Sequence, residues 1–121
     1  MNCFVLRQVE TGYKFDLKAA NGQVILTSEI YVSRAAALKG IASVRSSAAR
    51  AKVENQTEEG CEALTNPKFE MFRDRAGLFR FRLKARNGKI IGVSEAYSAK
   101  SGCLNGIESV KINAPGAETG E

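Results

Sequence analysis

The chain contains two copies of one sequence, 66 residues apart. Between residues 3–48 and 69–114, 17 of the 46 aligned positions are identical, and the alignment needs no gap. The most similar stretches are FDLKAANGQVILTSEIY, which begins at Phe15, and FRLKARNGKIIGVSEAY, which begins at Phe81. A unit of this length is too small to bury a core of its own. We therefore expect the two copies to pack on each other and to share one core.

Each copy is predicted to form three antiparallel strands. In the second copy, residues 78–85 alternate between apolar and basic side chains, a period typical of a strand with one buried and one exposed face. Asn87-Gly88 follows this strand, and Asn21-Gly22 occupies the same place in the first copy. Both dipeptides favour the tight turns of β-hairpins. A third strand is expected after each turn, over residues 23–29 and 89–95.

One amphipathic helix is expected after each third strand. Apolar residues recur there at helical spacing, namely Leu38, Ile41, Val44 and Ala48 in the first copy and Leu104, Ile107, Val110 and Ala114 in the second. Ser98 fits an N-cap, and Pro115-Gly116 is typical of a helix end. Gly40 and Gly106 hold the same helical position, which indicates that a backbone segment, of the sheet or of the other helix, approaches each helix closely there.

The predicted fold is α+β, a tandem pseudo-twofold repeat of β-β-β-α units with antiparallel sheet and with helices packed on one face. We assign residues 1–54 to the first unit, 55–67 to an acidic polar linker, 68–116 to the second unit and 117–121 to a flexible tail. Residues 51–54 leave open a short fourth strand. Because the repeat supplies an internal pseudo-dimer, we expect the chain to be monomeric.

The motif F-x-LKA-x-NG, followed by SE-x-Y and then by NGIESV, resembles the YegP-like family of small bacterial proteins, which have a duplicated domain of unknown function. The resemblance covers most of the chain. It implies tandem β3-α units and carries no established activity. The first copy departs from the motif at three places, where Asp16, Lys39 and Ala42 replace Arg82, Asn105 and Glu108.

The composition argues against several classes of protein. The chain has no histidine, which removes the commonest general base and the commonest zinc ligand. Cys3, Cys61 and Cys103 have no metal-type spacing and form no expected disulfide framework. Cys3 and Cys103 align with apolar residues of the other copy and are expected to be buried. Without an apolar run of about 20 residues or a signal peptide, we expect a cytoplasmic protein with no membrane contact, no cofactor and no metal.

The net charge of +5 is concentrated in the second copy, where residues 68–111 hold ten Lys and Arg against four Asp and Glu. Strand alternation places four cations on one exposed face, about 7 Å apart. They are Arg80, Arg82, Lys84 and Arg86, and Lys18 belongs to a weaker row in the first copy. We predict a non-enzymatic binding or interaction module that contacts nucleic acid or an acidic protein surface through this basic row. A solvated face that resists edge pairing explains the same pattern.

Two further hypotheses stay open. Glu29 with Tyr31, and Glu95 with Tyr97, recur at the strand-to-helix junctions. A carboxylate pair that faces across the pseudo-twofold axis would support an enzyme or a small-ligand protein, because one of the two pKa values would rise. The same side chains also fit capping and ring packing. The last hypothesis is an accessory chain that docks on a protein partner through an open sheet edge.

Overall fold

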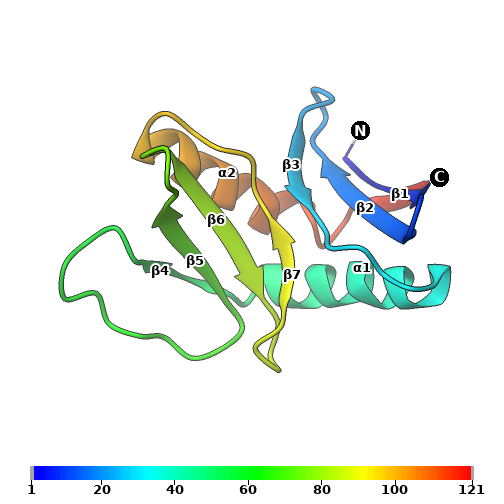
Figure 1. Cartoon of the computed structure of the whole chain (residues 1–121), viewed down its shortest axis with the longest axis horizontal. Coiled ribbons are helices and arrows are strands. Elements are labelled where there is room, and N and C mark those ends of the chain that lie inside the picture. The colour runs from blue at the N-terminus through cyan, green and yellow to red at the C-terminus, as the bar shows by residue number, and fades with distance from the viewer. Residues whose placement is uncertain (1, 121) are drawn as a thin grey trace.

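The computed structural model describes residues 2–120 and contains one eight-stranded sheet with two helices on one face (Figure 1). Met1 and Glu121, which the predicted first unit and tail include, lie outside this range. The first copy contains β1 (Cys3–Val9), β2 (Gly12–Lys18), β3 (Val24–Thr27), α1 (Arg34–Ala48) and β4 (Lys52–Asn55). The second contains β5 (Lys68–Arg73), β6 (Phe79–Lys84), β7 (Ile90–Val93), α2 (Lys100–Asn113) and β8 (Glu118–Gly120). The mixed α+β class is confirmed.

The strand order is β4-β5-β6-β7-β3-β2-β1-β8, which is unchanged when the two copies are exchanged. The copies meet in the middle of the sheet, where β3 and β7 pair antiparallel at Thr27 and Val93. Both helices span this seam, since α1 packs on β2, β6 and β7, and α2 packs on β3 and β6 (Figure 1). Neither helix within residues 2–120 is long and apolar enough to cross a membrane.

Each copy ends in a fourth strand that lies on the sheet edge of the other copy. β4 pairs with β5 and β8 pairs with β1, both in parallel, so the sheet is mixed rather than wholly antiparallel. Residues 118–120 of the predicted tail form β8. The edge of β1 satisfies the backbone of this segment, and Arg45 Nη2 donates at 2.7 Å to the carbonyl of Ala117 and to Thr119 Oγ1.

The two copies share one core, as the repeat predicts. Phe4 packs edge-on against Phe15, and Phe69 packs in the same way against Phe81, with ring centroids 5.8 Å apart in both pairs. At the seam, a Cβ added to Gly92 would lie 2.6 Å from the Leu26 side chain. Since Leu26 and Gly92 hold equivalent positions, the copies have diverged there into one large and one small residue.

The first strands of the two copies are out of step by one residue. Phe4 pairs with Leu17 and Phe69 pairs with Leu83, so Phe4 rather than Cys3 is the counterpart of Phe69. The shift arises because the β5–β6 turn is one residue longer than the β1–β2 turn. Cys3 therefore lies on the open face and is partly exposed, against the prediction. The buried position predicted for Cys103 is confirmed, and burial raises the pKa of its thiol to about 11.

The helices depart from prediction at two residues. The N-cap of α2 is Ala99, one residue after the predicted Ser98. Ala99 makes no side-chain capping bond. Leu104 is 41% exposed, and Cys103 takes the buried place on the helix instead. A close approach at Gly40 and Gly106 is confirmed, but the approaching group is a side chain and not the predicted backbone, because a Cβ at either glycine would overlap the hydroxyl of Tyr31 or Tyr97.

Candidate anion-binding site

Three of the four predicted row cations form ion pairs with acids on the same open face of the sheet. Arg80 Nε lies 3.2 Å from Asp74 Oδ2. Arg82 Nε and Lys84 Nζ lie 2.6 and 3.3 Å from the two carboxylate oxygens of Glu70. Three members of the predicted basic row are therefore held in ion pairs, and Arg86 is the exception among the described residues. The cause of the pairing is strand register, which sets Glu70 directly opposite Arg82.

These ion pairs continue into a buried network at the β4–β5 edge. Lys68 Nζ lies 2.8 Å from Glu54 Oε1 and 3.4 Å from Glu70 Oε2. The hydrogen bond from Lys68 is the main reason that the pKa of Glu54 is lowered to about 2. Burial works to raise the pKa of Glu70, but hydrogen bonds and charge from Arg82 and Lys84 outweigh it and lower the pKa. Much of the predicted site is thus a structural ion network.

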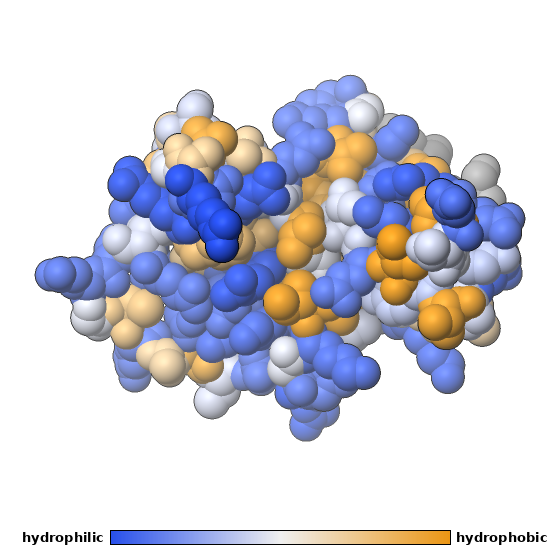
Figure 2. All heavy atoms as spheres, in the orientation of Figure 1, coloured by the Kyte–Doolittle hydropathy of each residue, from blue (hydrophilic) through white to orange (hydrophobic). Residues whose placement is uncertain are grey.

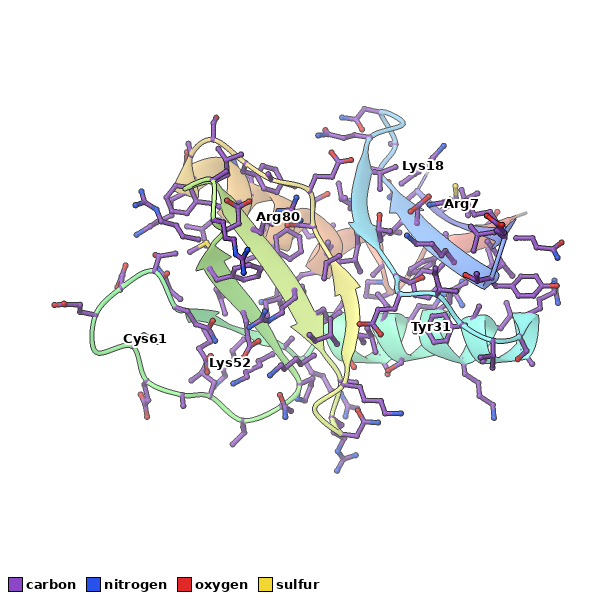
Figure 3. All side chains as sticks on the ribbon, viewed as in Figure 1. Arg7, Lys18, Tyr31, Lys52, Cys61 and Arg80 are labelled. Atoms are coloured by element: carbon purple, nitrogen blue, oxygen red, sulfur yellow. The ribbon has the colours of Figure 1, made fainter. Side chains whose placement is uncertain are left out.

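The first copy has a different charge arrangement on its open face. Asp16 stands at the position equivalent to Arg82. Its carboxylate accepts a hydrogen bond from Thr27 Oγ1 at 2.9 Å and pairs with Arg7 Nε at 3.1 Å. Lys18 lies on the other half of the sheet from Arg80 (Figure 3). The structure therefore does not join Lys18 to the basic row of the second copy.

The two glutamates of the alternative hypothesis do not face each other. β3 and β7 run antiparallel, so Glu29 and Glu95 leave the sheet at opposite ends. From the Thr27–Val93 pair, four residues of extended chain separate them, or about 13 Å along the strands. The expected carboxylate pair across the seam is not formed.

The Ser-Glu-x-Tyr motif instead fastens the end of each third strand to the second strand of its copy. Ser28 Oγ accepts a hydrogen bond from Phe15 N at 2.9 Å and donates to Glu29 O at 2.8 Å, and Ser94 repeats both bonds in the second copy. Tyr31 stacks on Phe15, with ring centroids 6.0 Å apart. Burial, and then the nearby Glu29 carboxylate, raise the pKa of Tyr31. These contacts give the motif a packing role.

Excess positive charge gathers instead at the β6–β7 turn. We define the basic cluster as Arg86 and Lys89 of this turn, Lys84 at the end of β6, and Arg50 after α1. In the described part of the chain, the side chains of Arg50, Arg86 and Lys89 form no hydrogen bond or ion pair, and all three residues are exposed. Hydrophilic side chains cover this turn at the lower edge of the view in Figure 2.

Two hollows flank the turn. One, of about 570 Å³, is lined by Arg50, Arg86, Asn87, Pro67, Ala85 and three serines of α1, Ser43, Ser46 and Ser47. The other, of about 530 Å³, lies at the seam, between Lys84 and Lys89 on one side and Glu29 and Tyr31 on the other. The cluster therefore borders concave surface on both sides.

The first copy provides an internal comparison. Its equivalents of Lys84, Arg86, Lys89 and Arg50 are Lys18, Ala20, Gln23 and Gly116. Four cations thus stand where the other copy has one, although the two turns share the same backbone conformation, with φ +83° at both Gly22 and Gly88. The charge is therefore not a requirement of the turn.

Sequence reasoning found Arg86 and Lys84, and it offered Lys89 as a residue that could widen the basic patch, but it missed Arg50 and the serines as site residues. A signal was present, because Ser43, Ser46, Ser47 and Arg50 follow the i, i+3, i+4, i+7 spacing of one helix face. Elsewhere, no three Cys, Asp or Glu side chains of residues 2–120 gather as ligands for a metal ion.

One family model, described as a domain of unknown function (DUF1508), matches residues 10–55 and matches again at residues 74–121. The chain belongs to the DUF1508 family. The predicted YegP-like resemblance is confirmed, since the UPF0339 protein YegP of Yersinia pestis is 40% identical over 111 residues, which are 91% of this chain and 86% of that protein.

The other DUF1508 comparisons bear on the repeat and on the fold. A UPF0339 protein of Treponema denticola is 62% identical over 50 residues, which are 41% of this chain but 86% of that protein, so it is little longer than one copy. The solution structure of yegP from E. coli, a protein of unknown function, matches with a TM-score of 0.77 and 38% identity. The match covers 98% of this chain and 90% of that one.

Proposed function

We propose that this DUF1508 chain is a non-enzymatic binding module that holds an anionic partner at the basic cluster. The observation that carries the proposal is the comparison of the two turns, in which the second copy has four cations where the first has one. Because both turns fold alike, the added charge is best explained by a ligand. We keep the expectation of a cytoplasmic monomer with this function.

The balance of charge supports the cluster over the rest of the open face. Glu54 and Glu70 face three cations, Lys68, Arg82 and Lys84, so the network leaves an excess positive charge at the Lys84 end. Arg86 and Lys89 add to this excess positive charge in the turn that joins β6 to β7. Adjacent cations without counter-charges raise the local potential and attract anions from solution.

Nucleic acid is the partner that fits this arrangement most concretely. A flexible single strand places a phosphate at every nucleotide, and four cations around one turn contact several of them at once. Among residues 2–120, the open face offers no row of exposed aromatic rings for base stacking, and Phe79 and Phe81 are buried on the helix side. We therefore propose binding through phosphates, without base recognition.

A fluorescent single-stranded RNA of random sequence should bind the chain with strong salt dependence. Four phosphate contacts give a log–log slope of affinity against salt of about −2.8. Exchanging Arg86 and Lys89 for glutamine should reduce the slope to about −1.4 and weaken binding at low salt. Fluorescence anisotropy over a range of NaCl concentrations measures both quantities.

The control is Lys14→Gln/Lys18→Gln, which removes the same charge from the first copy. Both lysines lie on β2, away from the basic cluster. This variant should keep the wild-type slope to within a few tenths. An equal loss in the two double variants, or no binding to the RNA at about 50 mM salt, would refute the proposed function.

A further inference from the structure

We propose that the hollow between α1 and the β6–β7 turn is a binding site for a single phosphate group. Its volume of about 570 Å³ falls within the range of small-ligand pockets. This inference rests on the proposed function, since Arg50 and Arg86 belong to the basic cluster, and it names the chemical group that they hold.

Two arginines face this hollow with no carboxylate between them. Elsewhere on the sheet, Arg7, Arg80 and Arg82 each have an acidic partner within 3.2 Å. Within residues 2–120, Arg50 and Arg86 have no such partner, although both line the same hollow. Two like charges around one cavity are stabilised by an anion that both contact, and the planar guanidinium matches phosphate oxygens with paired N–H donors.

Neutral donors complete the lining. Asn87 Oδ1 accepts a hydrogen bond from Lys89 N at 3.0 Å, which leaves both N–H groups of the amide available. Ser46 Oγ donates to Ser43 O at 3.2 Å, whereas the Ser43 hydroxyl has no partner among the described residues. Pro67 and Ala85 supply an apolar wall. The hollow thus combines two cations with an amide and a hydroxyl, a set suited to an oxyanion.

One feature of the helix opposes an anion here. The hollow lies beside the C-terminal half of α1, where the helix dipole is partly negative. A site built only from this helix end would repel phosphate, so binding depends on the two arginines. The equivalent place in the first copy has Ala20 and Gly116 in place of Arg86 and Arg50, and it is expected not to bind.

The test is a titration of the ¹⁵N-labelled chain with inorganic phosphate at constant ionic strength. Phosphate should shift the backbone amides of Ser43, Asn87 and Gly88 saturably, with no comparable shift at Asn21 and Gly22. The double variant Arg50→Gln/Arg86→Gln should bind at least tenfold more weakly. Lys39→Gln, an exposed cation on α1 eleven residues before Arg50, is the matched control and should bind as the wild type does.

The same titration with two phosphate esters then identifies the kind of phosphate that the site prefers. Tighter binding of glycerol phosphate indicates a terminal phosphate monoester, and tighter binding of dimethyl phosphate indicates the diester of a nucleic-acid backbone. Shifts that do not saturate, or that persist in the double arginine variant, would overturn the phosphate site. RNA binding without phosphate binding would refute this site alone. Saturable phosphate binding in a chain that fails to bind RNA would instead refute the nucleic-acid function and support the hollow.

Discussion

Neither half of the chain should form a stable monomer when it is cut from the other. Separation between Cys61 and Glu62 leaves β4 without β5, and β8 without β1, and it opens the shared core at the β3–β7 seam. Each half then exposes apolar surface that the other half covers in the intact chain. We therefore expect residues 1–61 and residues 62–121 to be largely unfolded, or weakly self-associated, at low micromolar concentration.

Mixing the two halves should restore the native fold as a 1:1 complex. Self-association of the first half sets Leu26 against Leu26 at the seam, whereas the native pair is Leu26 with Gly92. The heterodimer is therefore expected to be preferred over either homodimer. Circular dichroism with sedimentation velocity, on the separate and mixed halves, measures this. A compact, cooperatively unfolding monomer from either half would show that the copies are independent domains.

Replacing Lys68 by methionine should lower the free energy of unfolding by about 3 kcal/mol, because it leaves the buried Glu54 carboxylate without its cation. Glu70 loses one cation and keeps Arg82 and Lys84. Glu54 and Glu70 are only 5% and 3% exposed. The double variant Glu54→Gln/Lys68→Met should recover part of this loss, since it leaves fewer unpaired charges. Urea unfolding at pH 7 measures the differences. The control is Lys52→Met, an exposed cation on β4, which should change stability by less than about 0.5 kcal/mol.

The same network has a defined pH signature. The pKa of Glu54 is lowered from 4.5 to about 2 in the folded chain. Its contribution to stability is therefore fully present above about pH 4.5 and is lost as the pH falls toward 2. The difference in the free energy of unfolding between the wild type and Lys68→Met should therefore become smaller as the pH falls from 4.5 toward 2. A difference that stays constant down to pH 2.5 would mean that the ion pair is not the source of the stability.

The local elements were predictable because local chemistry determines them. Alternation over residues 78–85 and the Asn87-Gly88 pair specify a strand and its turn without reference to the rest of the chain. The sequence left the first of the two fourth strands open, over residues 51–54, and it gave no sign of the second. β4 has four residues and β8 has three. Each of them pairs with an edge strand of the other copy, so no local pattern specifies the pairing.

The candidate site shows a second limit of sequence reasoning. The ten cations and four acids of residues 68–111 give the net charge of this segment. They do not show which of the cations form ion pairs. Glu70 alone pairs with three of them, Lys68 on its own strand and Arg82 and Lys84 on β6, and the two pairs with β6 follow from the register of β5 and β6. Arg50 was missed for a related reason, because helix packing brings it beside a turn 36 residues later in the chain.

An exchange of charge between the two turns tests most directly whether the basic cluster carries anion binding. The variant with Ala20→Arg, Gln23→Lys, Arg86→Ala and Lys89→Gln keeps the net charge at +5 and moves two cations from the second copy to the first. On addition of the single-stranded RNA, we expect amide shifts at Asn21 and Gly22 in place of those at Asn87 and Gly88. Shifts that stay on the second copy, with unchanged affinity, would contradict the account.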